Sequence, residues 1–459
     1  MGAPITSRWA SQTQQTAVAC HRYQAVSGRF RLKRSCSSLQ TCVPCTPICY
    51  PAPTRAFKPS AGPYHRDVGL KEDLAERAAE LGFRAAGITS AEPFAEAGRA
   101  ALERTREGLM DGLPWWSARR VEVSADPRRS SPSARSLVAL AFPYEAPPPE
   151  PAPDGRTRGR VAAYALGPDY HDTLAARMAP LTEMLRQAGH SARTYVDHGW
   201  LLDRAAAARA GLGWLGKNTN LLLPGVGSYV FLSEIVTSAE LEPDAPLHKS
   251  CGACDACLRV CPTGALVAPG VLDNRRCISF WTIEHRGPIP LEIRPLIGDW
   301  VFGCDLCQEV CPINAYPRRA EPDPAPLQAY RQRPDSRPVL EELLGLDEPA
   351  FRTRFRGSAI WRTRRGGLLR NVCVALGNVG DRSSVPALAA TLGDPDPIVR
   401  GHAAWALGRL GGAAARHHLE AAISAESDPF ECDLALQACG PLVVLAAPAA
   451  PSPPPPGPA

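Results

Sequence analysis

Apolar positions over residues 65–250 alternate between helical and strand spacing. Residues 71–81 carry apolar side chains three and four positions apart, which predicts an amphipathic helix that ends at Gly82. Residues 136–144, SLVALAFPY, form a continuous apolar run, which is typical of a strand buried on both faces. We also expect helices over 170–189 and 204–213 and strands over 83–89, 193–197 and 228–237. This alternation indicates an α/β or α+β domain.

A different pattern follows residue 350. The segment ALGNVG at 375–380 recurs as ALGRLG at 406–411, a period of 31 residues. Each copy closes a helix that is expected to begin near Arg370 or Arg400. Paired helices of this period are similar to HEAT repeats, which bury their apolar faces only by stacking on their neighbours. The Pro-rich segment 446–459 lacks the apolar side chains of a core and is expected to be disordered.

Charge is unevenly distributed along the chain. The net charge is +5, yet residues 1–66 hold nine of the 51 Lys and Arg residues and none of the 46 Asp and Glu residues. The rest is therefore slightly acidic, and any affinity for nucleic acid must come from a local patch. No apolar run approaches the roughly 20 residues of a membrane helix. The composition predicts a soluble, cytoplasmic protein without membrane association.

The first 64 residues allow two interpretations. Their acid-free, Ser-, Thr- and Arg-rich composition suits an organellar transit peptide, which would make the protein organellar. It equally suits a wrongly extended start in a GC-rich reading frame. The segment CVPCTPIC at 42–49 spaces its cysteines like metal ligands, but its prolines favour a coincidence.

Eight of the 16 cysteines fall between residues 251 and 311, in C-x2-C spacings that favour metal ligation in a reducing compartment. CGACDACLRVCP contains the full C-x2-C-x2-C-x3-C-P run, and FGCDLCQEVCP contains all of it except the first cysteine. In two-cluster ferredoxins the first three cysteines of such a run hold one 4Fe-4S cluster and the fourth holds the other. Two tetrahedral zinc sites are the alternative, which the paired Cys-Pro signatures disfavour.

Applied crosswise, the ferredoxin rule assigns all eight ligands. The first cluster is expected on Cys251, Cys254, Cys257 and Cys311. The second takes Cys261, Cys304 and Cys307, and Cys277, the single cysteine between the two runs, completes it. No G-x-G-x-x-G or Walker loop follows a predicted strand, so neither a dinucleotide site nor an NTPase site is supported.

Residues 351–370 form a basic segment with seven Arg and no acidic residue. Guanidinium groups neutralise phosphates, and planar side chains stack on unpaired bases, so this segment predicts an RNA-binding surface. The alternative is a solvated basic face where a helical repeat array begins. The candidate contacts are Arg352, Arg354, Arg356, Trp361, Arg362, Arg364 and Arg365.

RAGLGWLGKN with GSYVFL, CISFWTIEHRG, IGDWVFGCDLCQEVCP and the repeat region together resemble the epoxyqueuosine reductase family, over about residues 65–445. The resemblance implies an α+β fold with a nitroreductase-like cobalamin-binding domain (65–245), a ferredoxin-like two-cluster domain (246–320) and C-terminal α-helical HEAT-like repeats (321–445). It also implies reduction of epoxyqueuosine to queuosine in tRNA with a GUN anticodon. Electrons would pass from an external low-potential donor through two 4Fe-4S clusters to cobalamin, in a protein expected to be monomeric.

The resemblance also implies roles for single residues. Asp197 matches the family's proton donor, and its alternative role is an N-cap of the following helix. Arg204 falls where the family has an Arg facing tRNA, and a buried ion pair is its alternative. The positions expected around the corrin are Lys217, Asn218, Leu221, Leu232, Ser279, Asp305 and Leu306.

Two departures from the family pattern bear on the site. The residues after Asp197 are His198-Gly199-Trp200, where the family usually has Thr or Ser, Gly or Ala, and Pro. We interpret His198 as structural or substrate-facing, because it adjoins the proton donor. Ser124 stands where many members have an Arg, so the candidates for an Arg that contacts the corrin are instead Arg119 and Arg120. The competing functions are a reductive dehalogenase-like cobalamin enzyme and a plain iron–sulfur electron-transfer protein.

Overall fold

A four-stranded antiparallel sheet forms the centre of the domain that holds the catalytic candidate Asp197. The computed structural model describes residues 69–144, 154–315 and 337–425. The strands lie in the order β1-β2-β7-β4. Their bounds are β1 (Ala85–Ser90), β2 (Ser136–Pro143), β7 (Val230–Thr237) and β4 (Ala192–Tyr195). The predicted strands are therefore confirmed, within one or two residues at most of their ends.

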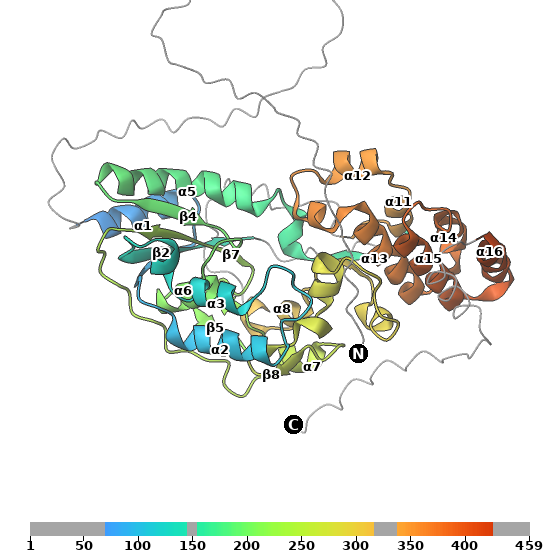
Figure 1. The fold of residues 1–459 in the computed structure, drawn as a ribbon, viewed down its shortest axis with the longest axis horizontal. Helices are drawn as coiled ribbons and strands as arrows, with labels where there is room; N and C mark the ends of the chain where they lie inside the picture. Colours follow the sequence, from blue (N-terminus) through green and yellow to red (C-terminus); the bar gives the residue numbers. More distant parts are fainter. Residues whose placement is uncertain (1–68, 145–153, 316–336, 426–459) are drawn as a thin grey trace, which may run out of the picture. The chain divides into compact units, whose positions relative to one another are not determined.

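Helices cover both faces of this sheet (Figure 1). On one face, α1 (Leu70–Glu80) and α5 (Tyr170–Gln187) pack on Leu140 and its neighbours two positions away in β2. On the other face, α6 (Asp203–Arg209) packs on Ala139 and Ala141. Successive side chains of a strand point to opposite faces, so a strand covered on both must be apolar throughout, as SLVALAFP is. The further elements of this region are α2 (Ala95–Arg106), α3 (Ala118–Ser124), α4 (Pro127–Ser130), β3 (Arg160–Val161), η1 (Ala163–Leu166), β5 (Trp214–Leu215) and β6 (Leu221–Leu222).

The cysteine-rich region consists of short elements joined by tight loops, the ferredoxin-like arrangement that was predicted. It contains one antiparallel hairpin, β8 with β9, and a strand, β10, that pairs in parallel with β3. The elements are α7 (Ala256–Val260), β8 (Leu266–Ala268), β9 (Val271–Leu272), η2 (Asn274–Arg276), η3 (Phe280–Glu284), η4 (Arg294–Ile297), β10 (Trp300–Phe302), α8 (Leu306–Glu309) and α9 (Pro312–Ala315).

Stacked helices form the last described region, which confirms the HEAT-like repeats. The two helices that end in the repeated ALG segment, α13 (Arg364–Val379) and α15 (Pro397–Leu410), pack directly on each other. A Cβ at Gly377 would lie 2.7 Å from the Trp405 ring and 3.0 Å from the Ala406 Cα, so the glycine allows this close approach. The remaining elements are α11 (Leu340–Leu344), α12 (Glu348–Phe355), η7 (Ala359–Thr363), η8 (Arg382–Ser384), α14 (Val385–Thr391) and α16 (Gly412–Ala425). Both repeat helices begin earlier than expected, so Arg370 and Arg400 lie inside them.

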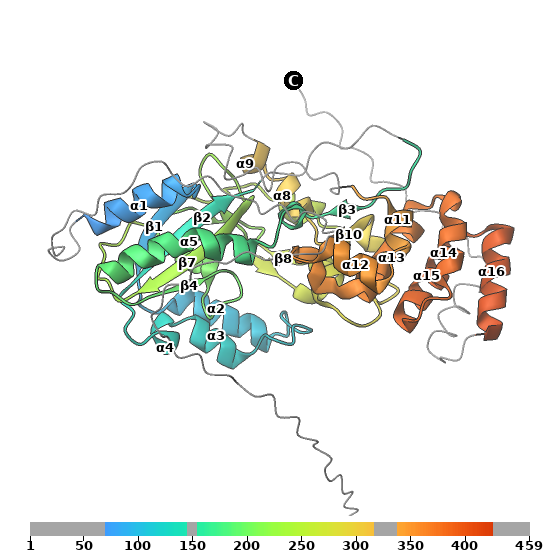
Figure 2. The same cartoon turned by 90° about the horizontal axis from the view of Figure 1, so that it is seen from above.

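The helical repeats and the cysteine-rich region share one hydrophobic core. Figure 2 shows α11, α12 and α13 beside β10, and apolar side chains of these elements form a single buried cluster with those of η3 and α15. Polar side chains of α13 also bond to the backbone of the cysteine-rich region. Arg370 donates to the carbonyls of Trp281, His285 and Gly287, and Asn371 donates to those of Thr282 and Val301. Arg370 is thus a buried structural residue.

Several expectations concern parts of the chain outside the described residues. These are the character of 1–64 with its cysteines at 42–49, most of the Pro-rich loop at 145–160, and the Pro-rich segment 446–459. Among the described helices, none has both the length and the apolar character needed to cross a membrane.

Candidate active site and cluster-binding region

The first predicted cysteine set comes together in space. Burial raises the pKa of the Cys257 thiol above its usual value, and the nearby thiols of Cys251, Cys311 and Cys254 raise it further. Burial also raises the pKa of Cys311, again with Cys251 and Cys254 as neighbours. Four cysteines from two chain segments more than 50 residues apart therefore lie near one another.

The second set comes together in the same way. Burial raises the pKa of Cys304, with the thiols of Cys277 and Cys307 close by. Cys307 lies near Cys277 and Cys261, and also near Cys257 of the first set. The two sets therefore adjoin at Cys257 and Cys307. Bound iron would invert the protonation of these thiols, because a coordinated thiol is deprotonated.

Hydrogen-bond donors lie near the sulfur atoms of Cys261 and Cys277 in the second set. The Ala265 N–H lies 3.3 Å from Cys261 Sγ, in the turn that Gly264 makes with a φ of 58°. The backbone N–H groups of Phe280 and Ser279 and the Ser279 hydroxyl all donate to the Cys277 thiol. Such donors stabilise a thiolate and, in iron–sulfur sites, help to set the reduction potential.

Asp197 projects from the loop between β4 and α6. Its φ is 53°, in the left-handed region that non-glycine residues rarely adopt, and strained backbone of this kind clusters at functional sites. The side chain is exposed, and its Oδ2 accepts a hydrogen bond from the hydroxyl of Tyr170, the first residue of α5. The N-cap of α6 is Leu202, so Asp197 does not cap that helix.

Two histidines flank this carboxyl. The His198 ring packs edge-on against the His171 ring, with 4.9 Å between centroids. Nδ1 of His171 lies 2.8 Å from the Asp169 carboxylate, and Nδ1 of His198 lies within hydrogen-bond distance of the Val196 carbonyl. The His198 side chain is therefore held against its own loop, at an exposed position.

A run of side chains connects Asp197 with the second cysteine set. The rings of Tyr170 and Tyr164 lie 6.0 Å apart. Burial raises the pKa of Tyr164, and the carboxylates of Asp197, Asp305 and Glu284 raise it further, so Tyr164 lies near both Asp197 and Asp305. Asp305 stands between Cys304 and Cys307, and its buried Oδ2 accepts a 2.6 Å hydrogen bond from the Ala163 N–H.

Arg120 fastens the far end of the Asp197 loop. Its Nη2 donates a 2.8 Å hydrogen bond to the Gly199 carbonyl. The guanidinium carbon lies 5.2 Å from the Trp115 ring centroid and 5.0 Å from that of Trp200, so the cation is flanked by two aromatic faces. Arg119 is exposed. The side chain of Arg120 is therefore engaged with the loop that carries the proton-donor candidate.

Lys217 and Asn218, two of the corrin candidates, bond to the cysteine loops. Lys217 Nζ donates to the Gly252 carbonyl at 2.7 Å, and Asn218 Nδ2 donates to the Cys307 carbonyl at 3.1 Å. The GKN segment therefore links the sheet domain to both cysteine sets.

The remaining corrin candidates divide between the sheet and the cysteine loops. Leu221 in β6 is buried and Leu232 in β7 is half-buried, and both belong to the apolar cluster beneath α6. Ser279 and Leu306 are half-buried beside Cys277 and Cys307, whereas the side chain of Asp305 is buried and bonded as described above.

Part of the basic segment borders the Asp197 site. The Gly357 carbonyl accepts a 2.7 Å hydrogen bond from the N–H of Asp169, the N-cap of α5. Arg362 pairs with Glu284 of η3 at 2.9 Å, and its charge acts on both Tyr164 and Tyr170. Arg352, Arg356, Trp361, Arg362 and Arg364 are exposed, with Trp361 stacked on Phe351 at 5.6 Å.

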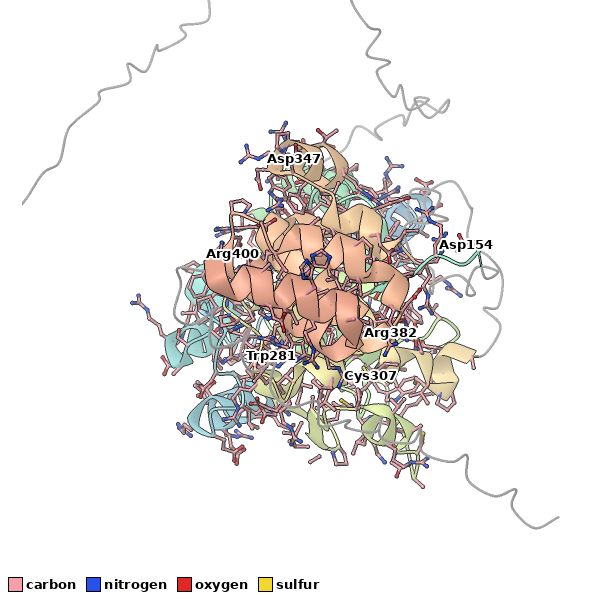
Figure 3. All side chains as sticks on the ribbon, turned by 90° about the vertical axis from the view of Figure 1, so that its right-hand side faces the viewer. Asp154, Trp281, Cys307, Asp347, Arg382 and Arg400 are labelled. Atoms are coloured by element: carbon pink, nitrogen blue, oxygen red, sulfur yellow. The ribbon has the colours of Figure 1, made fainter. Side chains whose placement is uncertain are left out.

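Other arginines of the candidate interface differ in their surroundings. The half-buried Arg354 has its guanidinium carbon 5.4 Å from the Phe355 centroid. Arg365 forms a shielded ion pair with Asp394 and donates to the Leu346 carbonyl. Figure 3 looks onto the repeat helices, with Arg400 and Arg382 on opposite sides of the layer.

Arg204 is exposed on α6 and forms no hydrogen bond or ion pair with the rest of the described chain, so the buried-pair alternative is wrong.

Comparison with known proteins decides the family. The 4Fe-4S double cluster binding domain matches residues 250–314, the Epoxyqueuosine reductase QueG family matches 125–198, and HEAT repeats match 366–439. The chain is 37% identical over 371 residues to the epoxyqueuosine reductase of Bacillus subtilis (strain 168), covering 78% of this chain and 92% of that protein. The chain belongs to the epoxyqueuosine reductase family. Identity to the epoxyqueuosine reductase of Escherichia coli (strain K12) is 38% over 352 residues, 74% of this chain and 89% of that one.

Solved structures agree with this assignment. An epoxyqueuosine reductase crystallised with an epoxyqueuosine-modified tRNA-Tyr stem loop superposes with a TM-score of 0.76 and 33% identity, over 82% of this chain and 99% of that one. The protein is thus an oxidoreductase with an α+β fold and a 4Fe-4S cluster-binding domain, and the zinc alternative is not supported. The resemblance that the GKN, CISFWTIEHRG and cysteine segments indicated is confirmed.

Sequence reasoning missed two residues of this epoxyqueuosine reductase family site and the contacts of a third. Tyr170 and Tyr164 connect Asp197 with the cysteine loops, and Arg120, named only as a corrin candidate, fastens the Asp197 loop. A signal existed for Tyr170, because DYHD places an N-cap Asp directly before an aromatic hydroxyl. Nothing in the local pattern of Tyr164 or Arg120 indicates which distant loop each one contacts.

Proposed function

We propose that this protein reduces epoxyqueuosine to queuosine in tRNA with a GUN anticodon, using two 4Fe-4S clusters, a cobalamin and an external low-potential electron donor. The observation that carries the proposal is the run from Asp197 through Tyr170 and Tyr164 to Asp305. It joins an exposed carboxyl to the loop of the second cysteine set. A proton source and an electron source thereby meet at one site, which a plain electron-transfer protein would not need.

The electron path follows from the cysteine sets. Cys251, Cys254, Cys257 and Cys311 would hold the outer cluster, and Cys261, Cys277, Cys304 and Cys307 the inner one. The inner set adjoins the Asp197 site through Asp305, whereas Cys254 of the outer set is exposed. An external donor would therefore reduce the outer cluster first. The proximity of Cys257 and Cys307 suits electron transfer from one cluster to the other.

The side chains near the inner cluster fit a cobalamin by the chemistry of their donors. A corrin is fringed with amide groups and carries a phosphate, which lysine, asparagine and serine side chains bind well. Lys217 uses one of its three N–H donors on Gly252, and Ser279 is half-buried beside Cys277. With Asn218, Leu221, Leu232 and the Asp305–Leu306 peptide, they would hold the cofactor. A cobalamin bound there would supply two-electron reduction at the epoxide carbon.

Asp197 would act as the general acid for the opening C–O bond. An alkoxide leaving from carbon needs a proton on its oxygen, and a positioned carboxyl group delivers one. Tyr170 holds Oδ2, while Oδ1 receives no hydrogen bond from the described residues and is available to the substrate. Because the loop is held at Gly199 by Arg120, the carboxyl keeps its orientation while the RNA binds.

The exposed part of the basic segment, with Arg204, would bind the tRNA. Phosphate contacts from Arg352, Arg356, Arg362 and Arg364 would orient the stem loop, and Trp361 offers an exposed ring for stacking. Gly357 and Arg362 border the Asp197 site, so this surface and the reacting base would be continuous. Arg354 and Arg365 would act less directly. A relative binds an epoxyqueuosine-modified tRNA stem loop, which supports this substrate.

An anaerobic assay on epoxyqueuosine-containing tRNA tests the proposal. Reconstituted wild-type protein with cobalamin and a low-potential reductant should produce queuosine, and Asp197→Asn should not, although its absorption spectrum remains that of the loaded wild type. A wild type that produces no queuosine contradicts the function. An equally active Asp197→Asn contradicts only the proton-donor role. A tRNA substrate and free thiols suit a cytoplasmic enzyme, or an organellar one if residues 1–64 direct import. We propose that it acts as a monomer.

A further inference from the structure

The carboxyl group of Glu234 is buried without a hydrogen-bond donor from the described residues. Glu234 is in β7, a central strand of the sheet, and its side chain is fully buried. Within the described chain, neither Oε1 nor Oε2 accepts a hydrogen bond from any N–H or hydroxyl group. An isolated buried carboxylate costs several kcal/mol, so an ionised Glu234 would be strongly destabilising here.

Glu234 interacts with a second buried carboxyl, that of Asp203. It is the first residue of α6, the helix on the same face of the sheet as Glu234, and its Oδ1 is also buried without a donor. The two side chains are close enough to interact directly. Two ionised carboxylates only accept hydrogen bonds, so they can bond to each other only when one carries a proton. A hydrogen bond between the two carboxyls therefore requires at least one proton on the pair.

This pair lies beneath the loop that carries Asp197. Glu234 is paired across the sheet with Tyr195, two residues before Asp197, and Asp203 follows the loop at its other end. The negative charge of Asp197 acts on both members, second only to burial for Asp203. Arg204 of α6 and Arg120 of α3 are the cations that act on Asp203. In the described part of the chain, Asp197, Arg204 and Arg120 are the charged groups found to act on the pair.

The proposed reaction consumes more protons than the Asp197 carboxyl carries. Removal of an epoxide oxygen as water breaks two C–O bonds, forms a C=C bond, and consumes two electrons and two protons. The external reductant supplies both electrons, but the Asp197 carboxyl carries only one proton. We infer that Asp203 and Glu234 form a proton store that reloads Asp197 between the two proton transfers of each turnover. This inference rests on the proposed function.

The shared proton is tested by infrared difference spectroscopy of the cluster-loaded protein across neutral pH. Wild type should show the C=O band of a protonated carboxyl that Glu234→Gln and Asp203→Asn both remove or shift. Burial raises the pKa of Asp203 to about 7 and that of Glu234 well above its usual value, so the band should titrate in this range. A wild type without the band contradicts the pair, whether or not the enzyme reduces epoxyqueuosine.

The reloading role is tested by single-turnover kinetics on modified tRNA. Glu234→Gln should convert substrate about tenfold more slowly, with unchanged tRNA affinity, because proton delivery by a placed group is worth at least this much. Rising concentrations of a small buffer acid should restore the rate, since an outside donor replaces the store, whereas a packing defect would not respond. Asp203→Asn should behave alike, and Glu183→Gln, an exposed residue of α5, should match wild type.

Three outcomes distinguish the proton store from a structural role of the pair and from a failure of the proposed function. Wild-type rates in both variants, with no dependence on buffer, overturn the proton store. Slow variants that buffer does not rescue also overturn it and leave a structural role for the pair. A wild type that produces no queuosine overturns the proposed function and the reloading role with it, while the infrared band still reports on the shared proton.

Discussion

The Tyr170 hydroxyl donates a hydrogen bond to Oδ2 of Asp197, so the first residue of α5 fixes a carboxyl that stands on a strained loop 27 residues further along the chain. Tyr170→Phe removes only this hydrogen bond, and a bond to a charged partner contributes about 1.5–3 kcal/mol. We expect the single-turnover rate to fall about tenfold or more, while affinity for the stem loop is unchanged. Equal rates in rapid-quench assays would show that Tyr170 does not orient the acid.

Substitution of Arg120 should also release the loop that carries Asp197. Arg120→Ala removes the hydrogen bond to Gly199 and the cation between Trp115 and Trp200, so the rate should fall roughly threefold to tenfold. Tryptophan fluorescence should also change, because two rings lose a neighbouring cation. Arg119→Ala is the matched control, since Arg119 is exposed one position away. If Arg119→Ala has the larger effect, the loop is held differently.

Cys277 should be needed for one cluster only. Cys277→Ser would reduce the iron content from about eight to about four atoms per chain, since each 4Fe-4S cluster needs its thiolates. Cys373→Ala, at a cysteine fully buried in α13, should keep all of the iron. Iron and sulfide analysis of anaerobically reconstituted protein measures this. Full iron content in Cys277→Ser would exclude it as a ligand.

Two arginines of the basic segment should separate stability from RNA binding. Arg365 and Asp394 keep only 15% and 6% of their side chains exposed, and breaking a buried ion pair costs about 3–5 kcal/mol, so Arg365→Ala should unfold at a clearly lower temperature. Arg356 is exposed, so Arg356→Ala should keep the melting temperature and weaken tRNA binding, with a salt slope smaller by about one. The reverse pattern would place the RNA surface elsewhere.

The buried pair of Asp203 and Glu234 should make the free energy of unfolding depend on pH. Because the folded-state pKa of Asp203 is raised to about 7, the folded protein binds more protons than the unfolded chain between the ordinary pKa of Asp and neutral pH. The free energy of unfolding should therefore fall as pH rises from about 4 to about 7. Asp203→Asn should flatten this part of the profile. Chemical denaturation at several pH values checks it, and an unchanged slope argues against the raised pKa.

The cysteine sets show what sequence predicts well. Metal-ligand spacing is set by the short reach of the chain around a cluster, so seven of the positions and their crosswise grouping follow from C-x2-C-x2-C-x3-C-P. Cys277 lies outside both runs and was assigned only as the single cysteine between them. The structure brings together the same two groups. The sheet strands were equally predictable, because burial on both faces leaves a continuous apolar run.

Long-range polar partners were not predictable in this way. Arg365 looked like its neighbours in the basic segment, yet it pairs with Asp394, which only the stacking of the repeats brings near. Glu234 did carry a signal, since a carboxylate inside the strand SYVFLSEIVT contradicts an apolar environment. Conflicts between a residue and its expected burial occur at functional sites, so a carboxylate in a buried strand is itself a signal of function.

The core shared by the repeats and the cysteine-rich region limits how this enzyme family can be recombined. Arg370 and Asn371 of one region complete the backbone hydrogen bonds of the other, so neither is a self-contained module. A chimaera that swaps the repeats between relatives must exchange β10 and η3 with them, or it will leave carbonyls unmatched in the interior. A change in the repeats that alters tRNA preference would thus require matching changes in the cluster-binding region.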